Sequence, residues 1–207
     1  MTHSEIKIRP MTKADFKSSA VIMTYAFRAK YVLLQSWTDE KIIDLTLAVP
    51  FFDPSNLEGH YVATYQQKVV GVLHLNWFEQ QKNRKNPKMD LVKLFRKFGF
   101  WRITITGMAL LLQDAKVKKD EMMVNHIAVH PDYRGQGIGA ALLAFGEEQA
   151  QKQQDITKYT LMVIGRNKRA RKLYERMGFK VNKVYDHPIT RFFTSVKTSQ
   201  YMIKTIG

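Results

Sequence analysis

The order of apolar and polar residues divides the chain into short strands and amphipathic helices. Strands are predicted where apolar residues alternate with polar ones or form β-branched runs, and helices where apolar residues recur every three or four positions. The expected strands cover residues 6–9, 60–66, 69–77, 122–129, 159–164, 181–185 and 195–203. The expected helices cover residues 12–29, 39–48, 138–151 and 168–177. This alternation predicts a layered α/β (α+β) domain with a central mixed sheet flanked by helices.

The sequence contains no internal repeat and no linker rich in Gly or Ser, so we expect a single domain over residues 1–207. Residues 60–66 and 69–77 are expected to form a hairpin. After this hairpin the strand pattern is interrupted: Pro87 opens a helical pattern that ends at Gly99, and residues 103–113 fit either a helix or a strand. We interpret residues from about 82 to 121 as a basic helical insertion before the strand at 122.

Two absences in the sequence narrow the classes of function. The 207 residues include no cysteine, which excludes a disulfide, a cysteine nucleophile and a thiolate metal site, and we expect no metal. The first ten residues are polar and charged. The longest uncharged apolar stretch, 103–112, is shorter than the about 20 residues that cross a bilayer. We therefore expect a cytoplasmic protein without a transmembrane segment.

The chain carries a net charge of +15, and nearly all of the excess lies in two segments. Residues 82–102 and residues 166–183 each contain eight basic side chains against one acidic side chain, a net charge of +7 in each segment. Solvated helix faces are one explanation of such runs, and anionic ligands are the other. The charge therefore suggests anionic partners.

The most informative stretch is a predicted strand that leads through a glycine-rich turn into a helix. The strand ends at Val129, and Gly135, Gly137 and Gly139 follow. Glycines at such a turn let consecutive backbone amides point into one concavity, and the helix N-terminus adds a partial positive charge. Such a turn can bind a pyrophosphate. The spacing departs from the Rossmann fingerprint and lacks the Lys-Ser/Thr of a Walker A loop, and a simple tight connection is the other explanation.

Two motifs carry a resemblance to a known family. The first, Arg/Gln-x-x-Gly-x-Gly/Ala after a strand of the form Ile-Ala-Val-x-Pro, is met by Arg134, Gly137 and Gly139 after residues 127–131. The second, Asn-x-x-Ala-x-x-x-Tyr-x-x-x-Gly-Phe, is met by Asn167, Ala170, Tyr174, Gly178 and Phe179. With both motifs in this order, residues 122–185 resemble the GCN5-related N-acetyltransferase (GNAT) superfamily. The resemblance implies the GNAT fold, in which the central mixed sheet is mostly antiparallel.

The resemblance also implies how acetyl-CoA would bind as co-substrate. Backbone amides of the glycine turn would hold its pyrophosphate near the charge of Arg134, and the strand 127–129 would pair with the pantetheine arm. Asn167 would bond to the pantetheine, and the same residue also fits a helix N-cap. The implied cofactor-binding residues are Ile127, Ala128, Val129, Arg134, Gly135, Gln136, Gly137, Ile138, Gly139 and Asn167. Tyr174 would protonate the departing CoA thiolate as a general acid, and a core tyrosine is the alternative.

The general base and the acceptor site are left open by the sequence. The acceptor amine must lose a proton before attack, because an amine with a pKa of about 10.4 is protonated at pH 7. Two positions where family members carry a glutamate hold Met123 and Met162 here. His126, Glu121 or ordered water could serve as the base, and strand alternation predicts that His126 faces away from Asn125. Placement alone suggests four acceptor contacts, Tyr25, Trp37, His187 and Arg191.

The leading hypothesis is an N-acetyltransferase that transfers the acetyl group of acetyl-CoA to a primary amine of a small molecule or peptide by direct attack. One alternative is a GNAT-fold protein that binds acyl-CoA without turnover, because no base is evident. The other is a basic nucleic-acid-binding protein, suggested by the net charge. Residues 166–183 would meet the CoA phosphates, and an anionic partner beyond CoA is expected at residues 82–102. The sequence is compatible with a monomer or a homodimer.

Overall fold

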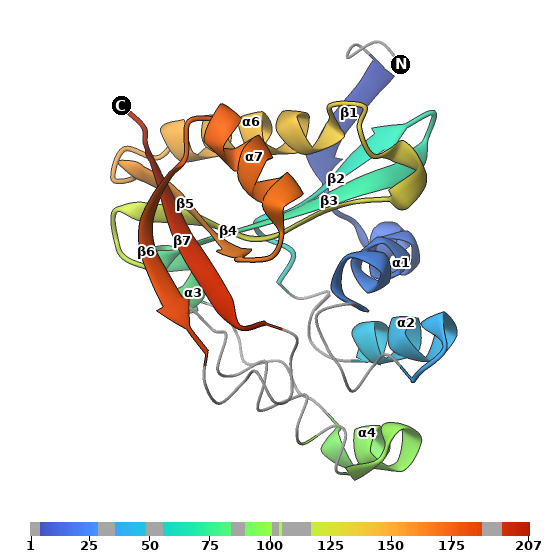
Figure 1. Ribbon diagram of the computed structural model, residues 1–207. Helices are drawn as coiled ribbons and strands as arrows, with labels where there is room; N and C mark the ends of the chain where they lie inside the picture. The colour runs from blue at the N-terminus through green and yellow to red at the C-terminus, as the bar shows by residue number, and fades with distance from the viewer. Residues whose placement is uncertain are drawn as a thin grey trace.

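The computed structural model describes residues 5–28, 36–48, 56–83, 90–100, 104, 117–187 and 196–207. Its elements in chain order are β1 (Ile6–Pro10), the 3-10 turn η2 (Lys13–Asp15), α1 (Phe16–Phe27), α2 (Asp39–Ala48), β2 (His60–Tyr65), β3 (Lys68–Trp77), α3 (Phe78–Asn83), α4 (Leu91–Phe98), β4 (Glu121–Val129), the 3-10 turn η6 (Pro131–Tyr133), α6 (Ile138–Gln151), β5 (Lys158–Ile164), α7 (Lys168–Arg176), β6 (Lys180–Asp186) and β7 (Thr198–Thr205). Figure 1 shows the strands side by side with helices on both faces.

The seven described strands form one sheet in the order β1-β2-β3-β4-β5-β7-β6. Every neighbouring pair is antiparallel except β4 and β5, which are parallel. The predicted mixed, mostly antiparallel sheet flanked by helices is therefore confirmed. The predicted hairpin is present as β2 and β3, joined by Gln66 and Gln67, which both have positive φ angles.

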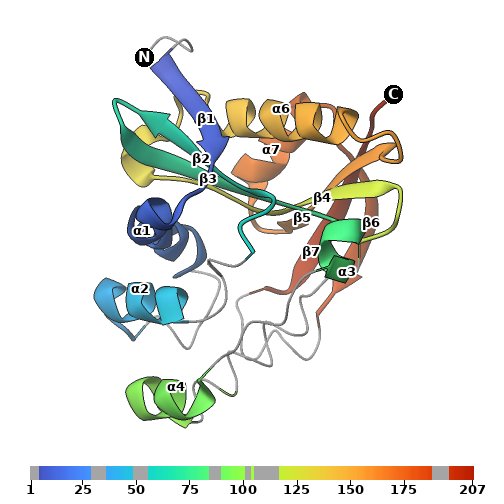
Figure 2. The same ribbon diagram turned by 180° about the vertical axis from the view of Figure 1, so that it is seen from behind.

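Helices on the two faces of the sheet bury two separate hydrophobic clusters (Figures 1 and 2). α6 and α7 pack on one face, where Leu75 and Leu142 are fully buried. α1 packs on the other face, where Ile22 and Val72 are buried. Full burial of a side chain of this size contributes about 1.5–3 kcal/mol. β3 and β4 are thus covered by described helices on both faces and lie at the centre of the sheet.

The helix that was expected to end at Gly99 is present as α4 and packs against α2. The carboxylate of Asp90 caps it by accepting a hydrogen bond from the Lys93 amide at 2.9 Å, and Gly99 follows its last turn with φ of 89°. The cluster between α2 and α4 consists of Trp37, Ile42, Leu45, Leu94 and Phe98. The apolar face of this basic helix is therefore used in packing.

Apart from shifts of one or two residues at element ends, the described elements differ from the predicted ones in three ways. The helix expected over 12–29 starts as α1 only after η2, because Thr12 and Asp15 form a capping box that closes a 3-10 turn first. α3 is absent from the predicted elements. β7 begins at Thr198 rather than at residue 195.

The insertion expected over about 82–121 is only partly covered by the described ranges. α4 lies within it, whereas the predicted helix or strand 103–113 lies outside the described residues apart from Thr104. The insertion itself therefore stays a prediction. Among the helices of the described ranges, none has the length and hydropathy needed to cross a membrane.

Candidate functional site

The parallel strands β4 and β5 separate partway along their length. They pair only from Glu121↔Lys158 to Val124↔Leu161. Beyond this point, among the described strands, β4 pairs only with β3 and β5 only with β7. The facing edge of β4 over residues 125–129 therefore offers backbone N–H and C=O groups that pair with no described strand. An open strand edge of this kind can pair with an extended ligand.

A β-bulge lies on β4 where the two strands separate. Leu75 pairs with Val124 and His74 pairs with His126, so Asn125 is the extra residue. The amide nitrogen of the Asn125 side chain lies 3.3 Å from Nδ1 of His74, and the ring centroids of His74 and His126 are 5.8 Å apart. The prediction that Asn125 and His126 face opposite sides of the sheet is therefore wrong, because the bulge interrupts the alternation of side chains.

The glycine turn after β4 presents a row of backbone amides. Gly135 and Gly137 have φ of 85° and 81°, in the left-handed region that glycine adopts without strain. Within the described part of the chain, the backbone amides of residues 135–140 donate no hydrogen bond. α6 begins at Ile138, so the positive end of its dipole lies at the same place. Such a combination binds phosphate groups in other proteins.

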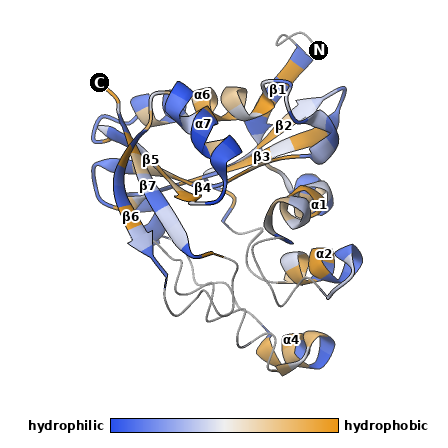
Figure 3. Cartoon of the chain, in the orientation of Figure 1, coloured by the Kyte–Doolittle hydropathy of each residue, from blue (hydrophilic) through white to orange (hydrophobic). Residues whose placement is uncertain are grey.

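α7 lies beside the glycine turn and is hydrophilic along most of its length (Figure 3). A Cβ added to Gly139 would lie 3.2 Å from Cδ2 of Leu173, so the two helices touch at this position. A Cβ added to Gly135 would lie 3.8 Å from Nη2 of Arg169. The basic segment 166–183 therefore reaches the glycine turn through the guanidinium of Arg169.

Asn167 and Tyr174 stand at the beginning of α7 and in its last turn. Oδ1 of Asn167 accepts a hydrogen bond from the Ala170 amide at 3.1 Å, so Asn167 is the N-cap of α7. Tyr174 is 7% exposed, and its ring meets that of Phe179 nearly edge-on with centroids 6.1 Å apart. Burial raises the pKa of Tyr174 to about 12, so this core phenol keeps its proton at neutral pH.

The other side chains considered as bases lie away from the separated part of β4 or cannot take a proton. Glu121 is 3% exposed, and its Oε1 lies 3.4 Å from Nζ of Lys118. At about 3.3 Å per residue, Glu121 is about 13 Å along the strand from the bulge. Met123 is buried, Met162 is partly exposed, and a thioether is only a weak hydrogen-bond acceptor. Among the residues considered as bases, His126 alone is a titratable side chain at the separation.

The four residues suggested for the acceptor lie in different surroundings. Tyr25 is 44% exposed, and its ring meets a histidine ring of the loop after β4 edge-on. Trp37 is buried and stacks on a phenylalanine of α4, so it belongs to the packing between helices. Nε2 of His187 lies 2.8 Å from Oγ of Ser199 at the end of the β6–β7 pair. Arg191 lies outside the described residues.

Sequence reasoning missed two histidines that the sheet brings next to His126. His60 of β2 and His74 of β3 are direct cross-strand partners, are almost fully buried, and stack with ring centroids 3.7 Å apart. The predicted hairpin register could have placed these two together. The approach of His126 depends on the bulge, for which the sequence has no local signal. The described residues contain no group of three or more His, Asp or Glu side chains arranged to hold a metal ion.

Comparison with known families supplies the deciding observation. The model of the acetyltransferase (GNAT) family matches residues 24–179, well over half of the 207 residues. The chain belongs to the GNAT acetyltransferase family. GNAT acetyltransferases use acetyl-CoA as the acetyl donor. Comparison with curated protein sequences gave no match.

Solved structures resemble this GNAT protein over nearly its whole length. One acetyltransferase is 23% identical with a TM-score of 0.63, covering 97% of this chain and 100% of its own. An N-acetyltransferase from Staphylococcus aureus Mu50 is 17% identical with a TM-score of 0.65, covering 96% and 100%. Naa50 from Arabidopsis thaliana, solved with the bisubstrate analogue CoA-Ac-MVNAL, is 16% identical with a TM-score of 0.57, covering 98% and 99%. At these identities the likeness establishes the GNAT fold alone.

Proposed function

We propose that this protein is an N-acetyltransferase that transfers the acetyl group of acetyl-CoA to a primary amine of a small molecule or peptide. The observation that carries the proposal is the continuity between the open edge of β4 and the amides of the glycine turn. Nε of Arg134 donates a hydrogen bond to the Val129 carbonyl at 3.2 Å and ties the turn to the end of the strand. The pantetheine arm of CoA could therefore pair with the backbone of β4 while the pyrophosphate that follows it binds the amides of the glycine turn.

The end of β4 is suited to bind the pantetheine arm through its backbone. Ile127 and Val129 pack into the cluster under α6, and Ala128 packs into the cluster under α1. Because both rows of side chains are held in this way, the backbone edge of residues 127–129 is presented to the ligand in a fixed position. An amide aimed at the thioester carbonyl would stabilise the developing oxyanion, an effect of about 2.7–4 kcal/mol per donor in another enzyme.

The glycine turn offers backbone amides and positively charged side chains that can bind the phosphates of CoA. The side chain of Arg134, from the first motif, and the guanidinium of Arg169, from the segment of the second motif, flank this turn. Both cations could therefore pair with the CoA phosphates. The residues that we expect to contact the pyrophosphate, mainly through their backbone, are Arg134, Gly135, Gln136, Gly137, Ile138 and Gly139. Asn167 would contact the pantetheine with its side-chain NH2, because the N-cap hydrogen bond uses only its oxygen.

The reaction follows from direct attack of the amine on the bound thioester. The sequence has no cysteine, so the acetyl group cannot pass through an acyl-cysteine. The neutral amine forms the N–C bond, and the C–S bond then breaks with its electron pair on sulfur. Tyr174 is the proton donor to this thiolate, since its buried phenol is protonated at neutral pH.

Two assays test this proposal. Acetyl-CoA should raise the thermal unfolding midpoint, because a ligand that binds only the folded state stabilises it. A thiol reagent should detect free CoA with at least one amine from a panel of polyamines, amino acids, aminoglycosides, and lysine or N-terminal peptides. A thermal shift without thiol release for any amine would favour the alternative, a GNAT-fold protein that binds acyl-CoA without turnover. The absence of a thermal shift would contradict both.

The exposed face of α4 supports a second proposal, that an anionic partner binds at residues 82–102. Among the described residues, Lys97 pairs with Asp44 at 2.8 Å, whereas the exposed side chains of Lys93 and Arg96 have no carboxylate partner. Neutralising Lys93 and Arg96 should abolish any salt-sensitive binding to nucleic acid or another polyanion and leave the CoA thermal shift unchanged. If polyanion binding survives, the partner does not bind at α4.

We also propose that the protein acts in the cytoplasm as a monomer or a homodimer. The absence of a cysteine is compatible with a reducing compartment. Light scattering with and without acetyl-CoA distinguishes the two oligomeric states, and a larger assembly would contradict both.

A further inference from the structure

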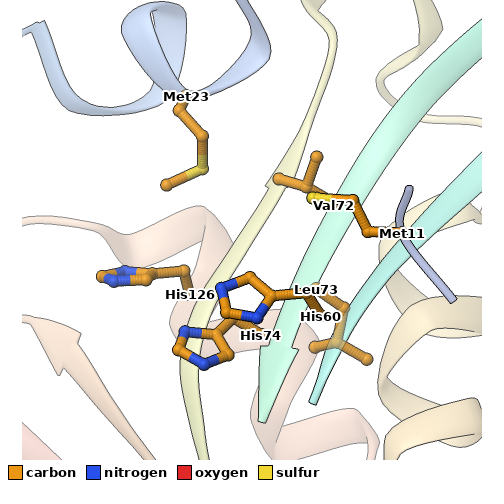
Figure 4. Close-up of a pocket in the computed structure, with 7 residues that line it drawn as sticks. All are labelled: Met11, Met23, His60, Val72, Leu73, His74 and His126. Carbon is orange, nitrogen blue, oxygen red and sulfur yellow. The ribbon is translucent and has the colours of Figure 1, made fainter. Parts of the chain in front are cut away.

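Three histidines from neighbouring strands meet on the face of the sheet that α1 covers. His60, His74 and His126 come from β2, β3 and β4 and line a small cavity with Met23 of α1 (Figure 4). The rings of His60 and His74 lie one over the other, with centroids 3.7 Å apart and 16° between their planes, and His126 lies to the side. This cluster adjoins the bulge where β4 separates from β5.

The contacts of His74 favour its neutral form. The amide nitrogen of Asn125 lies 3.3 Å from Nδ1 of His74, and because an amide nitrogen can only donate, this contact is a hydrogen bond when Nδ1 is the unprotonated acceptor, as it can be in the neutral ring. The stacked ring of His60 acts in the same direction, because two imidazolium ions at 3.7 Å would repel each other. His60 and His74 therefore form a buried, stacked pair in which a second positive charge is unfavourable.

His126 differs from this pair in its exposure and its position. It is partly exposed, whereas His60 and His74 are 4% and 5% exposed. It directly precedes Ile127, where the strand edge that we assign to the thioester begins. Among the described residues that line the cavity, the titratable groups that face His126 are the two other histidines, and the remaining ones are apolar: Met11, Met23, Val72 and Leu73.

The acid and this histidine lie on opposite faces of the sheet. Tyr174 belongs to the cluster under α6 and α7, whereas His126 lies on the α1 face with the cross-strand neighbour His74. A thioester held at the edge of β4 would therefore have a proton donor on one side and an imidazole on the other. This arrangement separates the group that protonates the thiolate from the group that meets the amine.

We propose that His126 is the general base of the transfer and that Asn125 and His74 are positioning residues for it. This inference rests on the proposed function and deepens it. The protonated amine gives one proton to His126, and its nitrogen then forms the N–C bond. Tyr174 protonates the leaving thiolate and regains a proton from the amine nitrogen through water. His126 finally releases its proton to solvent, so that one amide, one thiol and one proton are formed.

The test uses the amine that gives the highest thiol release with the wild-type protein. His126→Gln keeps a side chain of similar length that cannot take up a proton. We expect kcat/KM for the amine to fall by about 10²-fold or more, with loss of the acidic limb of its pH profile. The thermal shift caused by acetyl-CoA should be unchanged, which shows that the variant is folded at the CoA site. His126→Ala should regain activity when free imidazole is added.

A matched control is His130→Gln, because His130 lies four residues further on, outside the cavity, with its ring against Tyr133. This variant should keep the acidic limb of the pH profile of kcat/KM. The inference is overturned if His126→Gln keeps the acidic limb of the wild-type pH profile, or if imidazole restores no activity to His126→Ala. The proposed function would survive either result. If the wild-type protein releases no thiol with any amine, the proposed function itself fails and this role fails with it.

Discussion

Gly139 of α6 and Leu173 of α7 are packed so closely that a Cβ on the glycine would lie 3.2 Å from Cδ2 of the leucine. The contact joins the two sequence motifs, because Gly139 closes the glycine turn and Leu173 directly precedes Tyr174. It also fixes Arg169 beside the turn. If the CoA phosphates bind at this turn as proposed, their affinity should depend on how α6 and α7 are packed.

Gly139→Val should displace α7 from the turn. The added side chain exceeds the space beside Leu173, and overpacking of this kind costs about 1–3 kcal/mol. We expect a lower free energy of unfolding in urea and at least about tenfold weaker CoA binding by calorimetry, where tenfold corresponds to about 1.4 kcal/mol. Leu173→Ala in the same chain should restore part of both losses. Losses that simply add in the double variant would show that this contact does not set the position of α7.

Gly135→Ala should weaken CoA binding through the backbone. Its φ of 85° costs a residue with a Cβ about 1–2 kcal/mol, and the turn would relax away from the conformation that presents its amides. Gly99→Ala is the matched control, because Gly99 has a similar φ of 89° at the end of α4 and a Cβ there would meet no atom of the described residues within 4 Å. Both variants should lose similar stability in urea, but only Gly135→Ala should bind CoA more weakly. Equal CoA affinities would exclude the turn as the phosphate site.

Arg169→Gln should weaken CoA binding and reduce its dependence on salt. The guanidinium lies beside Gly135, where it can pair with a phosphate, and we expect about a tenfold loss for this solvent-exposed contact. Arg176→Gln removes the same charge about 10 Å further along α7 and is the control. The measurement is the dissociation constant of CoA at low and high salt. Equal effects of the two substitutions would indicate that the summed positive charge of residues 166–183 attracts CoA and that Arg169 makes no direct contact with a phosphate.

Tyr174→Phe should slow turnover with little effect on CoA binding. The phenol is the proposed proton donor, and loss of general acid catalysis typically costs about 10²- to 10⁴-fold. The phenylalanine ring fills the same space against Phe179, so the thermal shift caused by acetyl-CoA should persist. Single-turnover thiol release compares the chemical step in the two proteins. A wild-type rate of thiol release in this variant would contradict the role of Tyr174 as proton donor and show that it is only a core residue.

The burial of Tyr174 also predicts a loss of stability in alkali. Its pKa is about 12 in the folded protein, and an unperturbed tyrosine has a pKa of about 10. The fold therefore favours the neutral phenol, and this contribution is present below about pH 10 and lost as the pH rises toward 12. Over that interval it amounts to about 1.4 kcal/mol per pH unit. Urea unfolding should show a shallower decline for Tyr174→Phe than for the wild type, and parallel declines would contradict the raised pKa.

Much of the fold could be predicted from the sequence because most elements have strong local signals. The hairpin β2–β3, the strand β4 and the helices α6 and α7 follow the expected periodicities. α3 was missed because its six residues, Phe78–Asn83, are too few for a helical period to be evident. The predicted start of α1 was early because Thr12 caps a 3-10 turn and not the helix itself.

The candidate site could be predicted only where its residues form a motif. The glycine turn and the cap at Asn167 have local signals, and the structure places them as expected. The separation of β4 from β5 and the bulge at Asn125 depend on pairing between residues far apart in the sequence. Strand alternation therefore gave the wrong face for Asn125 relative to His126, and the stacked pair of His60 and His74 was missed.

The central claim is that the open edge of β4 and the glycine turn hold acetyl-CoA for transfer to an amine. The most direct measurement is mass spectrometry of each amine in the panel after incubation with the protein and isotopically labelled acetyl-CoA. The account predicts one labelled acetyl group on at least one amine, formed in step with free CoA, and formed more slowly at limiting acetyl-CoA by Gly135→Ala but not by Gly99→Ala. Labelled product that forms equally well with both variants, or free CoA without any acetylated amine, would contradict it.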